Sequence, residues 1–497
     1  MQNEEKNTRL QRHLPQRTLP LEVTAEFTLP DYHSEISRLL WITPTVLPPE
    51  RYVSAGKAEL SGKILFHILY VGPDGGLCAL VQESGYGFTL PLEEEGEVLI
   101  LCAPPSADTV IGRVNGPRKL SVRCKLRASV EQLCEASTAP LFKGEGKEPC
   151  RLCDAEHTGR ILCADTEGFP LAERVEMEEG TRLILSRGNL LLGEVSCEQD
   201  AVRCRGELLL TLLFCKEEAG ATPYTVARRI PFEQSIPLAG ASAACRACAD
   251  GTVGEIDASV EEGHVDVVAH VLLRALALRE EPVLFFRDVF LPGHGVDCSY
   301  DTVEFPAPAC FESRHFTLSG ERALADLGVG EEILPLDSIA TVEIREITRE
   351  GDKSILNADL CCRILYQRGE ELSCVDATFP LRLPLERGGE ELHVEANVAG
   401  VRLTVAHGLL RADAELQLSL RGFTPVRHTL LREASFGDAQ PLRDSCPELY
   451  YPAPGERLWD VAKRYGVSPD ALAEKNGISA EAPSDAASLA GKRFLLI

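Results

Sequence analysis

The stretch Leu120–Arg127, LSVRCKLR, alternates an apolar residue with a polar or charged residue at every step. A period of two places all the apolar side chains on one face of an extended strand, as in a sheet with one buried face. The stretch Glu415–Arg421, ELQLSLR, alternates in the same way near the other end of the chain. The two stretches therefore predict equivalent half-buried strands in a mainly β protein.

Two short landmarks recur three times along the chain in the same order. The first is an apolar pair closed by an aromatic residue: Ile68–Tyr70, Leu212–Phe214 and Ile364–Tyr366. The second has a proline between two aliphatic residues: Leu90–Leu92, Ile236–Leu238 and Leu383–Leu385. Successive aromatic residues are 144 and 152 positions apart. Each copy therefore has the length of a whole domain rather than of a solenoid unit.

The second landmark also indicates the kind of sheet. Proline cannot donate to a sheet ladder, which favours an edge strand or a bulge at that point in every copy. Short antiparallel strands then predict a sandwich or an open barrel for each copy. A third landmark is weaker, because Phe27–Leu29 resembles Phe316–Leu318 while the middle copy offers only Val175–Met177. The predicted fold is three tandem antiparallel β domains followed by a small C-terminal module.

Composition divides the chain into domains and connecting segments. Stretches rich in turn-forming and polar residues predict linkers between the copies, and a polar start predicts a disordered tail. The expected boundaries are a tail at 1–20, repeats at 21–137, 168–291 and 309–423, linkers at 138–167, 292–308 and 424–447, and the C-terminal module at 448–497.

Charge and hydropathy limit the expected partners. The chain carries 76 acidic and 51 basic residues, a formal net charge of −25. Such a surface repels phosphate backbones and anionic lipid headgroups, so we expect no nucleic-acid partner. No stretch approaches the roughly 18 apolar residues that span a bilayer, and Met1–Arg17 lacks the apolar run of a signal peptide. We expect an intracellular protein without a membrane span.

The last fifty residues predict a β-α-α-β module. Glu448–Tyr451 has the pattern of a short strand, and Arg493–Ile497 that of a closing strand. Between them, apolar residues at helical spacing, with Gly466 as the stop, predict a first helix. Ser468 and the proline after it predict the start of a second helix, which Gly477 ends. The apolar stripe of the first helix consists of Leu458, Val461, Ala462 and Tyr465.

This order and two motifs, GERLWDVAKRYGV at Gly455–Val467 and GKRFLLI at Gly491–Ile497, resemble the LysM family. The resemblance implies a shallow groove for glycans that contain N-acetylglucosamine, between the loop before the first helix and the loop after the second. By position, the groove residues are Gly455, Glu456, Arg457, Leu458, Asn476, Gly477 and Ile478. For Leu458, as for Trp459 and Tyr465, a place in the small core is the favoured alternative.

The groove departs from the family pattern at Glu456 and Arg457, where the family usually has Asp-Thr. A long cation on the lip of the groove suits an acidic protein partner at least as well as a neutral sugar. The sequence therefore leaves both kinds of partner open.

Three β-rich domains with these landmarks, followed by a LysM domain, resemble the SPOCS-domain spore-coat morphogenetic proteins of SipL type. The resemblance covers nearly the whole chain, and the middle copy is the most divergent. It implies a scaffold in the mother-cell cytosol of a sporulating bacterium, at the forespore surface, that helps coat layers to encase the forespore. The implied partners are a coat-assembly ATPase, contacted by LysM, and other coat proteins. The alternative is a cell-wall anchor that binds peptidoglycan or chitin-type glycans.

The sequence offers little support for catalysis. Cys150, Cys153, His157 and Cys163 are ligand types of a zinc knuckle, but a strand that begins at Ile161–Cys163 and carries a buried thiol is the favoured alternative. His67 lies within an apolar strand pattern, where a structural histidine is commoner than a base. No nucleophile elbow, phosphate loop or metalloprotease helix occurs. We expect a non-enzymatic protein without catalytic residues, metal or cofactor.

Overall fold

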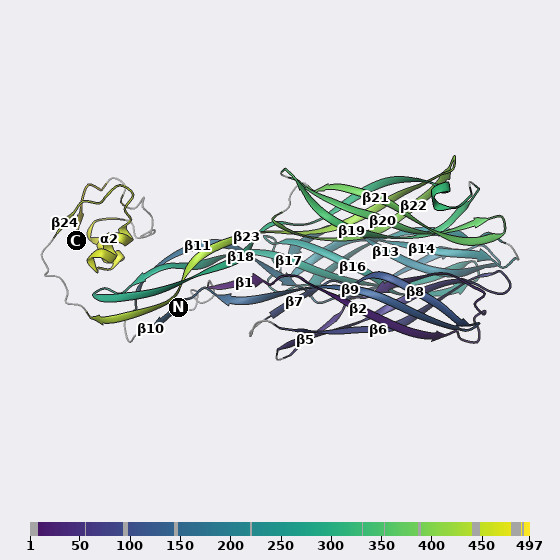
Figure 1. Ribbon diagram of the computed structural model, residues 1–497, viewed down its shortest axis with the longest axis horizontal. Coiled ribbons are helices and arrows are strands. Elements are labelled where there is room, and N and C mark those ends of the chain that lie inside the picture. Colours follow the sequence, from purple (N-terminus) through teal and green to yellow (C-terminus); the bar gives the residue numbers. More distant parts are fainter. Residues whose placement is uncertain are drawn as a thin grey trace.

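Strands make up 76% of the chain and helices 4%, so the mainly β fold predicted from the alternation is confirmed. Figure 1 shows an elongated molecule with a thick body of sheets, a stalk of long strands, and a small helical module at the tip. The computed structural model of the chain describes residues 8–54, 56–92, 98–143, 148–218, 221–330, 332–351, 353–385, 389–439, 448–478, 489 and 492–497.

The first repeat is a sandwich of two antiparallel sheets. One sheet has the order β2-β9-β8, with β1 and β7 also paired to β9, and the other has the order β3-β5-β6, with β4 also paired to β5. The strands are β1 Arg9–His13, β2 Arg17–Thr28, β3 Arg38–Val46, β4 Glu50–Ser54, β5 Lys57–Val71, β6 Leu77–Pro91, β7 Val98–Cys102, β8 Ser106–Gly116 and β9 Lys119–Ser137.

The second and third repeats have the same arrangement. Their sheets are β12-β17-β16 with β13-β14-β15, and β18-β23-β22 with β19-β20-β21. The strands of the second are β12 Glu167–Glu176, β13 Thr181–Glu198, β14 Ala201–Lys216, β15 Tyr224–Pro237, β16 Arg246–Glu261 and β17 His264–Phe290. Those of the third are β18 His294–Ala323, β19 Leu334–Glu350, β20 Lys353–Arg368, β21 Glu371–Leu385, β22 Glu391–Ala406 and β23 Leu409–Ala439, with the short 3-10 helix η1 Leu324–Leu327.

The aromatic landmarks occupy matching positions, as predicted. Tyr70, Phe214 and Tyr366 lie thirteen residues after the first residue of β5, β14 and β20, respectively. Each of these strands is the middle strand of its sheet. The partner strand bulges opposite the residue before each aromatic, between Leu39 and Trp41 in the first copy and at the equivalent points in the others. The equivalence of the copies therefore extends to their irregularities.

The weaker landmark fails in the third copy. Phe27 pairs with Leu120, one residue after the β8–β9 turn. Phe316 pairs with Leu416, seven residues after the corresponding turn, so the predicted match is displaced by six residues. A shift by an even number keeps the same face buried, and for this reason the alternation alone could not reveal the error.

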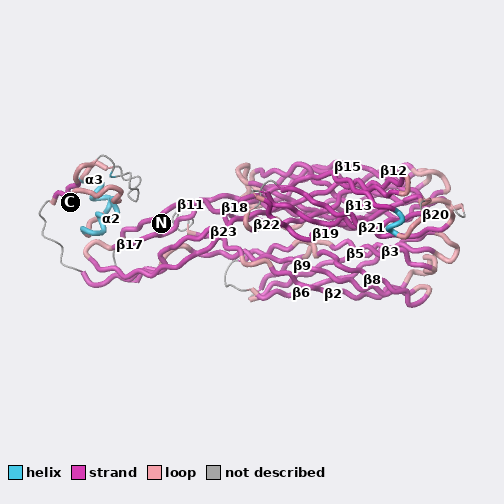
Figure 2. Tube along the Cα trace, turned by 45° about the horizontal axis from the view of Figure 1, so that its top comes forward, coloured by secondary structure: helices cyan, strands magenta, loops and turns pink. Residues whose placement is uncertain are grey.

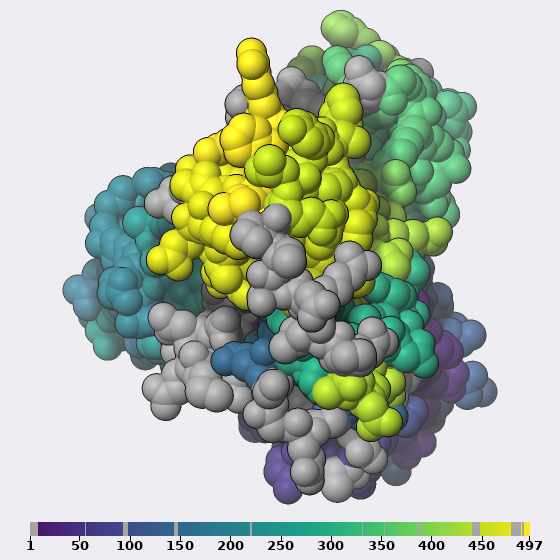
Figure 3. Space-filling model, turned by 90° about the vertical axis from the view of Figure 1, so that its left-hand side faces the viewer, coloured from purple at the N-terminus to yellow at the C-terminus, as the bar shows by residue number. Residues whose placement is uncertain are grey.

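The three repeats pack around a common axis through outer faces of their sheets. Leu69, Leu213 and Leu365 each precede a landmark aromatic and meet in one buried cluster. Successive side chains of a strand face opposite sides, so these leucines point away from the sandwich cores, which lie within each repeat. Viewed end-on, the repeats form three lobes behind the tip module (Figure 3). The body is thus one assembly with an approximate three-fold arrangement.

The stalk is built from segments that we expected to be linkers. β17, β18 and β23 continue beyond the body, where β11 (Cys150–Cys163) pairs with β17 and β10 (Leu141–Lys143) pairs with β23 (Figures 1 and 2). The linker predictions for 138–167, 292–308 and 424–447 are therefore wrong for most of their described residues. Residues 144–147 and 440–447 lie outside the described ranges.

We predicted linkers because these segments contain polar residues and prolines. Strands with a thin core and open edges can contain such residues, and the stalk strands are of this kind. Pro306 of β18 lies opposite Pro425 of β23. Because β18 pairs only with β23 among the described strands, an absent N–H on its other side costs no ladder bond. The stalk core consists of two short rows of buried apolar residues: Leu10, Val283, Phe285, Phe305 and Leu430 in one, and Phe286, Val289, Leu431 and Ala434 in the other.

The tail predicted at 1–20 is also wrong where it is described. Arg9–His13 forms β1, which pairs with Leu133–Ser137 of β9. Leu10 is buried in the stalk core, and the Gln11 side chain exchanges hydrogen bonds with the backbone of Ile161 at 3.2 and 2.7 Å. Buried contacts of this kind order a terminal segment whose composition is polar. Residues 1–7 lie outside the described ranges.

The tip module has the predicted β-α-α-β order. Its elements are β24 Leu449–Tyr450, α2 Leu458–Tyr465, α3 Pro469–Lys475 and β25 Leu495–Leu496. None of the helices in the described ranges has the length and apolar character needed to cross a membrane.

Candidate functional site

The two helices of the tip module share a small core. α2 ends at Gly466, whose φ of 65° lies in the left-handed region that glycine adopts at low cost. The predicted stop and most of the predicted apolar stripe are therefore confirmed, although Tyr465 is only partly buried and its ring lies 5.5 Å from that of Tyr450. The buried residues of the two helices include Leu458, Trp459, Val461, Ala462, Leu472 and Ala473.

Two loops leave the small sheet at the same end. Tyr450 of β24 pairs with Leu495 of β25. Tyr451 opens the loop into α2, and Phe494 closes the segment that follows α3, so both flank this pair. Their exposed fractions are 68% and 52%. Exposed aromatic rings at the mouth of two loops offer flat apolar faces to a ligand.

The sequence reasoning missed these two aromatic residues, although a signal was present. Leu495 is buried and Tyr450 is partly buried. Because successive side chains in a strand face opposite sides, Tyr451 and Phe494 had to face outward. Two outward aromatic side chains on adjacent strands mark a surface patch rather than a core.

Glu456 is held inside its loop. Its carboxylate accepts hydrogen bonds from the Tyr450 hydroxyl at 2.7 and 2.8 Å and from the Ala453 N–H at 3.0 Å, and it pairs with Arg464 at 2.8 Å. Burial opposes ionisation, but these hydrogen bonds and the Arg464 charge outweigh it and hold the pKa of Glu456 below its usual range. Glu456 therefore shapes the loop.

Arg457 and Leu458 lie at the start of α2 and contact the helix or its core. The Arg457 guanidinium donates to Asp460 in the first turn of α2, at 3.0 and 2.9 Å, and its side chain is 43% exposed. Leu458 is fully buried, as the core alternative predicted, so its side chain does not reach a groove.

On the other side of the module, Asn476 ties the end of α3 to the closing strand. Its side-chain amide donates to the Leu496 carbonyl at 3.0 Å and accepts from the Leu496 N–H at 2.7 Å. Lys492 donates to the carbonyls of Asn476 and Gly477 at 2.7 and 3.4 Å. Ile478 packs against the core. These contacts fix the second loop at its start.

Of the seven predicted groove residues, only Gly455 and Gly477 are exposed; the others are buried or partly buried. Both glycines have positive φ, 81° and 56°, and form the turns of the two loops. The surface open to a ligand therefore includes the Tyr451 and Phe494 rings, the backbone of these two turns and the partly exposed Arg457 side chain. Residues 479–488 of the second loop lie outside the described ranges.

The module is docked on the stalk through Asp288 of β17. This carboxylate accepts a hydrogen bond from the Trp459 indole at 2.8 Å and pairs with the Lys463 ammonium at 2.7 and 2.8 Å. The Phe290 ring meets that of Trp459 edge-on, with centroids 4.9 Å apart. Leu152 of β11 belongs to the same cluster as the module core. Contacts of both kinds orient the module at the end of the molecule.

Metal-ligand side chains form one compact group in the described part of the chain. Glu261, His264 and Asp266 lie together at the β16–β17 turn, but Asp266 already pairs with Arg174 at 2.7 and 2.9 Å. The candidate zinc ligands between Cys150 and Cys163 are spread along the strand β11, and no described metal-ligand group includes them.

Comparisons with known proteins identify the module and nothing else in the chain. No curated protein and no solved structure matches the chain. The family model of the LysM domain matches residues 453–483, which include the loop into α2, both helices, and the start of the second loop. The tip of the molecule is thus a LysM domain.

Proposed function

We propose that the chain is a non-catalytic binding protein whose LysM domain binds glycans containing N-acetylglucosamine. The observation that carries this proposal is the exposed pair Tyr451 and Phe494, which flanks the residues 453–483 matched by the LysM model. Sugar rings present C–H faces that pack against aromatic rings, and the exposed turns at Gly455 and Gly477 offer backbone groups for hydrogen bonds. The stalk holds this surface at the far end of the molecule (Figure 1).

A sedimentation assay tests the glycan proposal. The full chain is mixed with purified peptidoglycan or with chitin, and the bound fraction is measured after centrifugation. We expect co-sedimentation with at least one of the two polymers and no release of soluble fragments. Failure to bind either polymer would contradict glycan binding, and release of muropeptides would contradict the non-catalytic part.

A scaffold in spore-coat assembly is the second candidate. Three sandwiches fused into one body, with a stalk and a docked module, present an extended surface suited to several protein partners, and the repeat landmarks resemble those of spore-coat morphogenetic proteins. In this role the chain would act in the mother-cell cytosol at the forespore surface, with a coat-assembly ATPase and other coat proteins as partners. Crosslinking in sporulating cells tests it: capture of coat proteins supports the role, and their absence from the crosslinked products contradicts it.

Arg457 distinguishes the two candidates. Its guanidinium is partly exposed and donates to the carboxylate of Asp460 within its own helix, which leaves it open to an acidic partner. If an acidic coat protein docks there, Arg457→Ala weakens that complex by about 1 to 3 kcal/mol. If instead the substitution leaves protein binding intact and abolishes binding to chitin-type oligosaccharides, the domain uses a sugar groove.

A further inference from the structure

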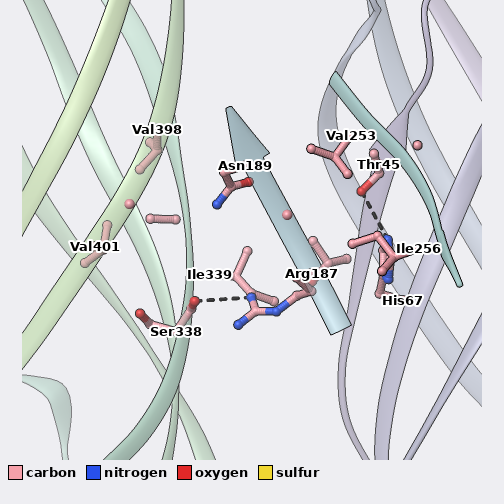
Figure 4. A pocket seen from close by; sticks show the side chains of 15 residues that line it. Thr45, His67, Arg187, Asn189, Val253, Ile256, Ser338, Ile339, Val398 and Val401 are labelled. Carbon is pink, nitrogen blue, oxygen red and sulfur yellow. Dashed lines mark hydrogen bonds between the residues drawn. The ribbon is translucent and has the colours of Figure 1, made fainter. Parts of the chain in front are cut away.

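A cavity of about 90 Å³ lies where the three repeats meet (Figure 4). Its walls come from β3 and β5 of the first repeat, β13 and β16 of the second, and β19 and β22 of the third. One water molecule needs about 10 to 15 Å³ of such space, so the cavity has room for several waters or for one small ligand.

Backbone irregularities help to open this space. The β16–β17 register shifts between Val253 and Ile256, and the β22–β23 register shifts between Val398 and Gly400. All four residues line the cavity. An inserted residue bends its strand and re-aims the neighbouring side chains, and bulges are common beside functional sites.

The charge of the lining contrasts with that of the whole chain. Fifteen residues line the cavity; they include Arg187 and no aspartate or glutamate. The chain as a whole carries a net charge of −25. Asn189 is exposed, so the cavity communicates with solvent on that side. The carboxylate that balances this guanidinium, Asp337, lies behind the lining, so a ligand in the cavity meets N–H donors and no acidic side chain, which favours an anion over a cation.

Arg187 is held in place by the third repeat and keeps donors to spare. Its Nη2 donates to both carboxylate oxygens of Asp337, and its Nη1 donates to the Ser338 carbonyl at 3.2 Å. A guanidinium has five N–H groups, so these contacts leave two for another acceptor. Figure 4 shows the side chain reaching from β13 toward Ser338 across the cavity.

His67 provides a second donor. Its Nε2 lies 3.2 Å from the Thr45 hydroxyl. Its Nδ1 is buried without a hydrogen-bond partner in the described part of the chain, and the residue is only 8% exposed. When the Thr45 hydroxyl donates to Nε2, the proton of the neutral ring sits on Nδ1. A buried N–H without a partner is unfavourable, and a bound acceptor would satisfy it.

These polar groups are departures from the repeat pattern. Asp337 lies opposite the landmark leucine of the third copy, and Arg187 lies two residues after the position opposite the landmark leucine of the second copy. Each of these two strand positions can be compared across the three copies. In the order of the copies, the residues are Thr43, Arg187 and Ile339 at one position and Trp41, Leu185 and Asp337 at the other. Burying an ion pair is costly, and the other copies show that smaller or apolar residues fit these positions. The charged pair is therefore not required to fill these two positions.

We propose that the axial cavity binds a small oxyanion, a carboxylate or inorganic phosphate, with Arg187 as its main anchor and His67 and Asn189 as further donors. A planar guanidinium matches the geometry of two oxygens of a carboxylate or phosphate. The donors come from two different repeats, and the anchor is held by the third. The ligand would consequently stabilise the assembled body.

Calorimetric titration of the full chain in a chloride buffer tests the site, with sodium phosphate and sodium acetate as probes in separate experiments. We expect saturable binding of at least one probe, and the stronger of the two identifies the oxyanion class. We also expect that probe to raise the thermal transition of the body. The absence of saturable binding of both probes would overturn the proposal and leave the cavity to water.

Variants locate the binding. The double variant Arg187→Leu, Asp337→Leu removes both charges and leaves neither buried alone, so we expect a folded protein with at least about tenfold weaker binding. His67→Thr introduces the residue found at the equivalent position of the second copy, Thr211, and Asn189→Ala changes an exposed side chain; both should weaken binding without unfolding.

The matched control is Arg205→Gln, which alters an exposed arginine of β14 that pairs with Glu194 and Glu233. It should bind the probe as the unchanged chain does. Undiminished binding by the folded double variant, or by both His67→Thr and Asn189→Ala, would place the anion elsewhere and refute the axial site.

Discussion

The repeats of the body and the LysM domain at the tip bury their apolar side chains in different ways. Each repeat has a core whose buried residues come from its own continuous stretch of the chain. The LysM core, by contrast, includes Leu152 and Phe290 from the stalk. A domain of about fifty residues supplies little core of its own, so contacts with a larger neighbour add substantially to its stability. The tip domain therefore depends on the stalk for both stability and orientation.

The largest expected effect is a loss of stability when a core residue of the tip domain is replaced. Trp459→Ala removes a side chain that is 1% exposed, its contact with Phe290 and its hydrogen bond to Asp288. We expect a loss of about 3 to 5 kcal/mol in the unfolding free energy of the domain. Calorimetry should show a separate, lower transition for the tip, with the body transition unchanged. A single unchanged transition would mean that the indole is not part of the core.

Acid should affect the two regions in different pH windows. Burial lowers the pKa of His13 and of His67 to about 4, from 6.5. Between pH 6.5 and 4 the unfolded chain binds more protons than the folded body, so each histidine costs about 3 kcal/mol of stability as the pH falls through that window.

The tip domain has no histidine. Its Glu456, with a pKa below the usual 4.5, contributes stability above pH 4.5 that is lost as the pH falls further. Chemical denaturation followed at pH 7, 5 and 4 should therefore show the body weakening first. His67→Thr should reduce the loss in the body. Equal losses in both regions between pH 7 and 5 would contradict this assignment.

The repeats and the LysM domain could be predicted from the sequence, whereas the stalk could not. The repeats could be predicted because Tyr70, Phe214 and Tyr366 recur at fixed strand positions. The LysM domain could be predicted because its motif depends on local features, such as the glycine that ends α2 at Gly466. The stalk was missed because its strands mix prolines with polar residues at open edges. No local pattern shows that three distant segments lie side by side.

The sequence assigned the candidate site to two loops but did not show which of their side chains face outward. The two loops are where the LysM pattern puts them, yet Glu456 and Asn476 turn inward to hydrogen-bond partners that only the folded chain brings close. The exposure of Tyr451 and Phe494 follows from strand alternation, because each is the neighbour of a residue in the Tyr450–Leu495 pair that faces the module core.

A smaller effect is expected from the docking carboxylate. Asp288→Asn keeps the shape of the side chain but removes the charge that holds Lys463, and should weaken docking by about 1 to 3 kcal/mol. Small-angle X-ray scattering should detect a larger maximum dimension or a broader range of tip positions. Asp301→Asn, at an exposed position of the stalk strand β18, is the control and should leave the scattering unchanged. Identical scattering from both variants would show that the apolar contacts suffice.

Titration calorimetry with N-acetylglucosamine oligomers tests whether the LysM domain binds glycan through its exposed aromatic pair. The unchanged chain should bind, and the Tyr451→Ala, Phe494→Ala double variant should bind at least about tenfold more weakly, since each removes an exposed ring without opening the core. Tyr32→Ala, at a distant tyrosine that is 85% exposed, should bind normally. Equal affinity of the double variant and the unchanged chain, or no binding by the unchanged chain, would contradict the account.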